Sequence, residues 1–233
     1  MIPGNTTVSA KHSEISEISA NLLAVIDTGR IMKIYYDDGI VKIRSMIPSD
    51  ARILYDTYLS YGWHPNIRTY EDYYKEQEEG ERLVFIAEYE GTVKGQCTLV
   101  LHPAEGPWGG MDYPEIVDLT VFFDVHGRGI GNRLLDVAES EAAGLSDMVF
   151  LAVGVHSGYG PAQRIYVKRG YIPDGSGVWY KNKVLEQYAP CVNDDDLLLF
   201  LSKSLTCPDY DHTIHQNGCR ECCGKPDFGI QDP

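Results

Sequence analysis

Apolar side chains along the chain change repeatedly from helical spacing to the alternation of a β-strand. Over residues 9–28 they recur three and four positions apart, which predicts an amphipathic helix that ends at Gly29. Residues 30–36 and 40–46 are strand-like and flank Asp37, Asp38 and Gly39, a sequence typical of a hairpin turn. We therefore expect an N-terminal extension over residues 1–39, made of a helix and the first hairpin strand.

The middle of the chain continues this mixture of helices and strands. Helices are predicted at 48–61 and 70–78, a second hairpin at 83–89 and 92–102, and a glycine- and proline-rich loop at 103–114. A strand at 116–123 precedes a helix that ends near Gly144. Further strands are predicted at 148–155, 178–181 and within 194–205, with a turn at 172–177. These elements form a main domain over residues 40–205, and a separate tail follows at 206–233.

Three glycines mark the junction between the strand at 116–123 and the helix after it. The sequence His126-Gly127-Arg128-Gly129-Ile130-Gly131 removes side chains where the chain enters the helix, so a ligand can approach the backbone N–H groups closely. The positive end of the helix dipole lies at the same place. The junction therefore predicts a site for a phosphate or pyrophosphate, with a tight turn that binds nothing as the alternative.

Two other phosphate-binding loops do not fit this stretch. The dinucleotide fingerprint Gly-x-Gly-x-x-Gly fails because Asn132 stands at its third glycine. A P-loop needs Gly-Lys-Ser or Gly-Lys-Thr, and the chain has Gly131-Asn132-Arg133 instead. Both failures argue against a nucleotide-binding protein of these classes.

A second motif lies downstream, between Gly158 and Tyr171. It resembles the pattern Asn-x-x-Ala-x-x-Leu-Tyr-x-Lys-x-Gly-Phe of the GNAT superfamily of acyl-CoA-dependent N-acyltransferases. The glycine stretch resembles the pyrophosphate loop of the same superfamily, Gln/Arg-x-x-Gly-x-Gly/Ala. His126 stands where that loop has Gln or Arg, and Tyr159 where Asn is common. The residues that match the second motif are Ala162, Ile165, Tyr166, Lys168, Gly170 and Tyr171.

The resemblance covers about residues 40–205 and implies an α/β (α+β) fold of the GNAT type, with a mixed, mostly antiparallel central sheet flanked by helices. It also implies acetyl-CoA as co-substrate, with no metal required for catalysis. Backbone N–H groups at Leu119 and Val121 would bind the thioester carbonyl and the pantetheine, and Tyr166 would protonate the coenzyme A thiolate. The other residues expected to contact the cofactor are His126, Gly127, Arg128, Gly129, Ile130, Gly131 and Tyr159.

The same resemblance implies that the first pair of helices and their connection form one wall of the acceptor site. This region is rich in aromatic residues, which suits a partly apolar ligand or a cation–π contact. Trp63 and His64, in the connection, are the candidate substrate-binding residues. Ordinary packing of the rings is the alternative for most of them.

Two carboxylates near the strand are candidates for the base that deprotonates the amine. Glu115 lies eleven residues before His126, the spacing at which some histone-type members of the superfamily carry a catalytic glutamate. Asp118 follows three residues later, and an odd step on a regular strand turns two side chains to opposite faces. Only one of the two should then face the site, and we expect it to be Glu115, acting directly or through water.

Charge is the unusual part of the composition. The 233-residue chain has 20 Lys and Arg against 34 Asp and Glu, a net charge of −14. This balance argues against nucleic acid as a partner and favours attraction of a cationic amine, although solubility alone also accounts for it. Neither a signal peptide nor an apolar run long enough to span a bilayer is evident. We expect a cytoplasmic protein without membrane contact, whose N-terminal extension packs on its own sheet or forms a homodimer contact.

The tail from residue 206 contains residue types that bind zinc. His212, His215, Cys219, Cys222 and Cys223 lie close together, with Cys207 before them. Their spacing differs from a standard finger, because the histidines are close to one another and precede the cysteines. We expect a flexible, reduced tail, with a zinc site as the alternative.

These motifs predict an N-acetyltransferase that transfers the acetyl group of acetyl-CoA to a primary amine, either a small molecule or a lysine-type acceptor, by direct attack in a ternary complex. A non-catalytic acyl-CoA sensor or regulatory module on the same fold is the alternative function.

Overall fold

The first two predicted hairpins form a sheet in which strands that follow one another in the sequence pair side by side. The computed structural model describes residues 23–25 and 31–205. These residues divide into two compact units, one of residues 23–25, 31–101 and 117–140 and the other of residues 102–116 and 141–205.

The sheet of the first unit has the strand order β1-β2-β3-β4-β5-β6, and the pairs from β1 to β5 are antiparallel. Strands β4 and β5 are buried on both faces in their middle, where Phe85 pairs opposite Cys97. The bounds of these strands are β1 Leu23–Val25, β2 Ile31–Asp37, β3 Val41–Ser45, β4 Arg82–Tyr89, β5 Thr92–Val100 and β6 Glu115–Val121.

The predicted N-terminal helix is wrong where the structure can be compared with it. Leu23–Val25 form strand β1, which pairs with β2 through Leu23 and Lys33, and the rest of the predicted segment lies outside the described residues. Pairing with the free side of β2 satisfies backbone hydrogen-bonding groups that a helical pattern alone does not reveal.

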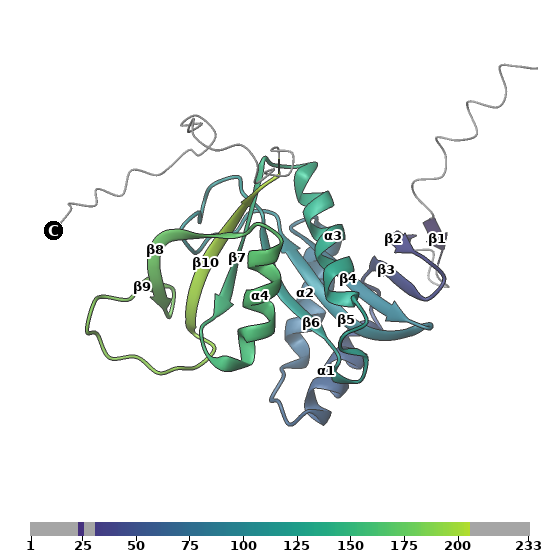
Figure 1. Cartoon of the computed structure of the whole chain (residues 1–233). Helices are drawn as coiled ribbons and strands as arrows, with labels where there is room; N and C mark the ends of the chain where they lie inside the picture. Colours follow the sequence, from purple (N-terminus) through teal and green to yellow (C-terminus); the bar gives the residue numbers. More distant parts are fainter. Residues whose placement is uncertain (1–22, 26–30, 206–233) are drawn as a thin grey trace, which may run out of the picture. The chain divides into compact units, whose positions relative to one another are not determined.

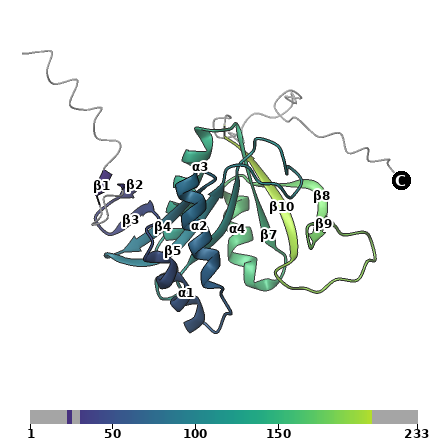
Figure 2. The same cartoon turned by 180° about the vertical axis from the view of Figure 1, so that it is seen from behind.

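Two helices cover one face of this sheet, and a third covers the other. Helix α1 (Asp50–Ser60) and helix α2 (Ile67–Glu79) lie on the face opposite to α3 (Ile130–Ala143), as the two views in Figures 1 and 2 show. Helix α1 buries Ala51, Leu54 and Tyr58, which are three and four residues apart and so share one side of the helix. Helix α2 begins where the Asn66 side chain accepts a hydrogen bond from the Arg68 N–H and ends at Gly80.

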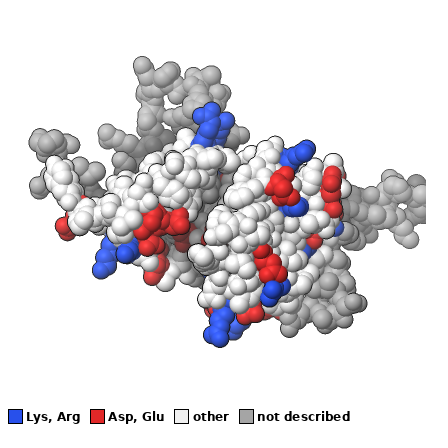
Figure 3. All heavy atoms as spheres, turned by 90° about the horizontal axis from the view of Figure 1, so that it is seen from below, with Lys and Arg blue, Asp and Glu red and all other residues white. Residues whose placement is uncertain are grey.

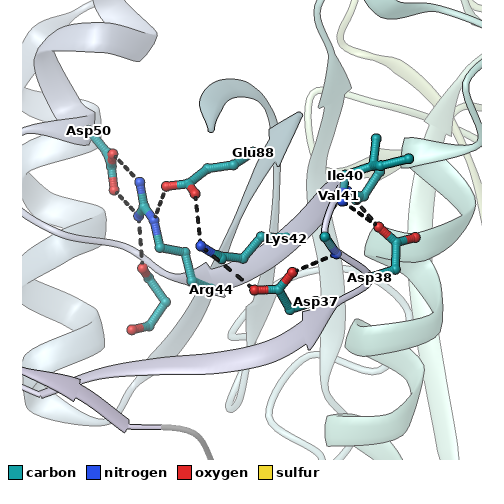
Figure 4. A network of polar contacts seen from close by, with 10 residues as sticks. Asp37, Asp38, Ile40, Val41, Lys42, Arg44, Asp50 and Glu88 are labelled. Carbon is teal, nitrogen blue, oxygen red and sulfur yellow. Dashed lines mark hydrogen bonds and ion pairs between the residues drawn. The ribbon is translucent and has the colours of Figure 1, made fainter. Parts of the chain in front are cut away.

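A buried arginine ties three elements of the first unit together (Figure 4). The Arg44 guanidinium on β3 donates to both carboxylate oxygens of Asp50, the first residue of α1, at 2.6 and 2.9 Å. Its Nε donates to the Glu88 carboxylate on β4 at 2.6 Å. The Arg44 and Asp50 side chains are 4% and 1% exposed, so neither charge has water to replace its partner.

We expect Asp50→Ala to lower the free energy of unfolding by about 3–5 kcal/mol, because it leaves the Arg44 charge buried with half of its hydrogen bonds. Urea unfolding followed by circular dichroism measures the loss. The matched control is Asp56→Ala, which breaks an exposed ion pair with Arg52 and should cost far less; the Asp56 and Arg52 side chains are 51% and 72% exposed. Equal losses for the two variants would contradict the structural role of Arg44.

The second unit has its own sheet and core. The first residues of β6, Glu115 and Ile116, pair in parallel with β7 (Met148–Gly154), and the order continues β7-β10-β8-β9 with antiparallel pairs. These strands are β8 Ile172–Tyr180, β9 Lys183–Val184 and β10 Leu197–Ser204. Helix α4 (Gly160–Lys168) covers one face of β7 (Figures 1 and 2), and Trp108, Phe150 and Phe200 form a buried cluster.

The predicted turn at 172–177 is wrong, because these residues belong to β8. The strand pairs with β10 at Pro173 and again at Val178, opposite Leu201 and Leu199, so the intervening residues of β8 bulge outward. Gly175 and Gly177 have φ of 88° and 90°, a conformation that suits glycine. The glycines that suggested a turn therefore mark an irregular strand instead.

None of the helices among the described residues has the length and apolar character needed to cross a membrane.

Candidate active site

The glycine stretch forms a loop that leads into helix α3. Gly127 and Gly129 have φ of 77° and 79°, so both positions need the left-handed backbone that glycine adopts without strain. The Arg133 N–H donates to the Gly129 carbonyl at 3.1 Å, which makes Gly129 the residue that caps the helix. Ile130 and Gly131 are the first two residues of α3, so no carbonyl of the helix lies four residues before them to accept their N–H groups. They are available to an anion.

The loop also leaves room for a ligand beside its backbone. A Cβ atom added at Gly127 or Gly129 would meet no other atom within 4 Å, and one added at Gly131 would meet only Val121 Cγ2, at 3.6 Å. Open space next to N–H groups at the start of a 14-residue helix is what a pyrophosphate requires. The residues present therefore fit the pyrophosphate of coenzyme A.

His126 holds the start of this loop. Its imidazole Nε2–H donates to the Val121 carbonyl at 2.8 Å, a bond that places the proton on Nε2. The imidazole edge also lies against the Phe123 ring, with ring centroids 5.4 Å apart. Phe123 begins the short helix η2 (Phe123–Val125) that joins β6 to the loop. His126 thus fixes the loop's shape from outside the glycines.

Two exposed arginines lie in or next to the loop. The Arg128 guanidinium lies 5.9 Å from the centroid of the Tyr89 ring, and that of Arg133 lies 4.8 Å from the centroid of Tyr36. Cation–π contacts of this kind orient a guanidinium while leaving its N–H groups for solvent or an anion. Both charges add to the attraction that the helix dipole exerts on phosphate groups.

Strand β6 is irregular at Asp118. This residue has φ of 54°, a rare conformation for a non-glycine residue, so the regular alternation of side chains stops there. The regular strand expected for Glu115 and Asp118, which would place them on opposite faces, is therefore wrong at Asp118. Leu119 and Val121 follow the irregularity, and Glu115 is the half-buried first residue of the strand.

Asp118 lies among tyrosines from α1 and α2. The Tyr73 hydroxyl donates to its carboxylate, and the Arg82 guanidinium lies 4.4 Å from the centroid of the Tyr73 ring. Burial and the nearby Asp118 charge raise the pKa of Tyr70 to about 12 and raise the pKa of Tyr73 as well. The Tyr73 hydroxyl therefore keeps its proton near neutral pH and remains a donor to Asp118.

The predicted substrate-binding residues lie in the connection between α1 and α2. Trp63 is 44% exposed and stacks on the Tyr58 ring with centroids 5.2 Å apart, while the His64 side chain is exposed. Tyr58 itself is buried and packs on Phe122, so the connection is anchored to the core by one ring and presents the other to solvent.

In the second unit, Tyr166 lies on α4 and is 6% exposed. Its ring is edge-on to Tyr171, with centroids 5.8 Å apart, and its carbonyl accepts a hydrogen bond from the Tyr171 N–H at 3.0 Å. Gly170, between them, has φ of 87° and allows the chain to turn back after the helix. The downstream motif thus fixes the position of Tyr166 through local contacts.

Tyr159, expected to contact the pantetheine, has its hydroxyl bonded within the protein. It donates to Asp195 Oδ1 at 3.0 Å, and the His156 Nε2–H donates to the same oxygen at 3.0 Å. The hydrogen bond from His156 is the main cause that lowers the pKa of Asp195. The Gly158 N–H donates to His156 Nδ1, which completes the group. Sequence reasoning missed His156 and Asp195, because neither belongs to a motif and 39 residues separate them.

A hollow of about 420 Å³ opens along α4. Two of its residues, Arg164 and Lys168, are basic, so it suits an anionic group. Its lining residues are Gly160, Gln163, Arg164, Val167 and Lys168. The face of the molecule in Figure 3 shows acidic and basic side chains in small separate groups rather than as one charged surface.

No group of three or more His, Cys, Asp or Glu side chains that could hold a metal ion occurs within residues 31–205. The histidines and cysteines of the C-terminal tail, from Cys207 to Cys223, lie outside the described residues.

This chain is similar to several solved structures, among them acetyltransferases. RimL, a ribosomal L7/L12 α-N-protein acetyltransferase, superposes with a TM-score of 0.60 at 11% identity, over 78% of this chain and 99% of RimL. YncA from Salmonella typhimurium, solved with its cofactor acetyl-CoA, has a TM-score of 0.53 at 16% identity, over 76% and 100% of the two chains. Naa50 from Arabidopsis thaliana, in complex with the bisubstrate analogue CoA-Ac-MVNAL, has a TM-score of 0.50 at 17% identity, over 70% and 98%.

These similarities confirm the predicted GNAT fold. A comparison with curated protein sequences finds no match. The model of the acetyltransferase (GNAT) family matches residues 50–171, which is 122 of the 233 residues and includes both motifs up to Tyr171. The chain therefore belongs to the GNAT family of acetyltransferases.

Proposed function

We propose that this protein transfers the acetyl group of acetyl-CoA to a primary amine by direct attack in a ternary complex. The observation that carries the proposal is the loop from His126 to Gly131, whose glycine backbone and open space at the start of α3 fit a pyrophosphate. Its place inside the family match supports coenzyme A over other phosphate ligands.

Several residues of the first unit are proposed to hold the co-substrate. The N–H groups of Ile130 and Gly131 bind the pyrophosphate, with Arg128 adding positive charge. His126 acts on the loop through its bond to the Val121 carbonyl, since that bond occupies its Nε2. The backbone of Leu119, directly after the irregular Asp118, binds the thioester carbonyl and withdraws electrons from its carbon.

Acetyl transfer forms one C–N bond and breaks one C–S bond. The amine must reach the thioester carbon with a free electron pair, so a base has to take the amine proton. The departing thiolate needs a proton in return, and we propose that the Tyr166 hydroxyl supplies it. Acetyl-CoA, when bound, provides the activated acyl group, and the residues of the chain orient it and move the two protons.

Glu115 is the proposed base, and Asp118 with Tyr73 is proposed to orient the amine. The hydrogen bond that Tyr73 donates holds the Asp118 carboxylate in place, which suits a carboxylate that accepts an N–H from the acceptor. The Tyr73 ring lies next to that carboxylate and packs edge-on against the buried Tyr70 ring, with centroids 6.1 Å apart.

The test is an acceptor screen with acetyl-CoA and the full chain. Small amines, amino acids, aminoglycosides, lysine peptides and peptides with free N-termini are incubated separately, and thiol release and a mass increase of one acetyl group are measured together. Peptide N-termini are included because RimL and the Naa50 complex act on or mimic such acceptors. Acetylation of one class supports the proposal, whereas binding of acetyl-CoA without transfer to any amine supports the sensor.

We expect Glu115→Gln to lower kcat about 10²-fold and to shift its pH profile, because general-base catalysis contributes roughly this factor. The dissociation constant of acetyl-CoA, measured by calorimetry, should change little. Asp118→Asn is the matched variant on the same strand, and we expect it to raise the acceptor KM more than it lowers kcat. An unchanged pH profile in Glu115→Gln would remove this residue from the role of base.

A further inference from the structure

We propose that Phe123 and Tyr61 are positioning residues that couple the coenzyme A loop to the acceptor wall. This inference rests on the proposed function, because it takes residues 126–131 as the loop that binds coenzyme A and residues 61–66 as part of the acceptor wall. Coenzyme A bound at the first segment would then fix the second.

The contacts on the loop side start from His126. Its ring lies edge-on against Phe123, with an interplanar angle of 89°, while its Nε2–H is bonded to the Val121 carbonyl. Any shift of residues 126–129 that follows phosphate binding must therefore move the Phe123 ring or break one of these contacts. A change in the loop's conformation would therefore reach the Phe123 ring first, because this ring contacts His126.

The contacts on the acceptor side start from Tyr61, the C-cap residue directly after α1. Its ring lies 4.3 Å from that of Phe123 between centroids, and its hydroxyl accepts a hydrogen bond from the Phe123 N–H at 3.3 Å. Trp63 then touches both rings, with centroids 5.7 Å from Tyr61 and 6.1 Å from Phe123. The three rings join segments that are 62 residues apart in the sequence.

Hydrophobic packing alone does not account for this arrangement. Phe122, the preceding residue, is 3% exposed and supplies the core contact to Tyr58, whereas Phe123 is 54% exposed and Trp63 is 44% exposed. An aromatic residue that stays half in water contributes less burial than the same ring in a core, so its contacts serve orientation more than stability. The exposed rings link the two functional segments without belonging to the core.

Coupling of this kind is reciprocal and modest. A well-oriented aromatic pair changes an equilibrium by about two- to tenfold, so coenzyme A should strengthen acceptor binding by a factor of this order, and the acceptor should strengthen coenzyme A binding equally.

Trp63 provides a direct readout of the coupling. The full-length protein is titrated with coenzyme A alone, and tryptophan emission and calorimetric heat are followed in parallel, with Trp63→Phe to assign the signal. We expect an emission change in the wild type that is absent from Trp63→Phe. Phe123→Leu should abolish the change while the dissociation constant of coenzyme A rises less than about tenfold, and Tyr61→Phe should reduce it.

The two measurements separate the possible failures. Calorimetric binding without an emission change in the wild type overturns the coupling and leaves the proposed function standing. An emission change that persists in both Phe123→Leu and Tyr61→Phe also overturns it, because Trp63 then responds to coenzyme A by another route. Absence of binding heat in the wild type overturns the coupling and the proposed function together.

Discussion

Replacing Gly129 by alanine is expected to raise the dissociation constant of coenzyme A by about 10- to 100-fold. The residue has φ of 79°, so a side chain strains the backbone although its Cβ would meet no atom within 4 Å. Relief of that strain turns the N–H groups at the start of α3 away from the phosphates. Loss of one hydrogen bond to a charged group costs about 1.5–3 kcal/mol, which corresponds to this range. Isothermal calorimetry with coenzyme A measures the change.

The matched control is Gly80→Ala, at the end of α2. Gly80 has φ of 77° and also has open space around its missing Cβ, so the substitution introduces the same backbone strain outside the loop. Both variants should lose about 1–2 kcal/mol of stability, measured by thermal unfolding, and only Gly129→Ala should lose affinity. Equal coenzyme A affinities in the two variants would show that the loop does not bind the pyrophosphate.

The predicted elements are correct where local spacing decides the structure. Helix α1 was expected from residue 48 and begins at Asp50, and β4 and β5 meet at the expected turn around Glu90 and Gly91. Helix α3 was expected to end near Gly144 and ends at Ala143. In each case the apolar periodicity and the turn or cap signal lie in the same short segment. The local sequence is therefore enough to predict the element and its bounds.

The wrong predictions concern segments whose secondary structure depends on residues far away in the sequence. Leu23–Val25 form a strand because β2 offers them partners, and residues 172–177 form one because β10 does. The positive φ of Asp118 has no signature in the sequence, since a residue other than glycine rarely adopts it. Pairing with distant strands and local backbone strain therefore determine the structure of these segments, and the secondary-structure propensity of a few neighbouring residues does not.

The candidate site shows the same division. The glycine turn before α3 and the helix that carries Tyr166 could be predicted, because a motif with short spacing marks each of them; the roles of these residues stay predictions. The hydrogen bond between Tyr73 and Asp118 spans 45 residues, and the one between Tyr61 and Phe123 spans 62. Such contacts depend on how helices pack on the sheet, so they become visible only in the folded chain.

Tyr166→Phe is expected to lower kcat by about 10²- to 10³-fold with the best acceptor from the amine screen. The substitution keeps the ring and its edge-on contact with Tyr171, and it removes only the hydroxyl proposed to protonate the thiolate. Because the ring packing is retained, the dissociation constant of acetyl-CoA should change less than about threefold. Steady-state kinetics over a pH series, together with calorimetry, measure both quantities.

Tyr171→Phe is the control that separates chemistry from packing. Tyr171 is 1% exposed, touches the same ring, and stands where the family motif has Phe, so this variant should keep the wild-type kcat. The Tyr166→Phe pH profile should also lose the ionisation of the general acid, an effect that a packing defect does not produce. If the two variants lower kcat equally, or if Tyr166→Phe retains full turnover, another donor protonates the thiolate and Tyr166 serves the fold of α4 alone.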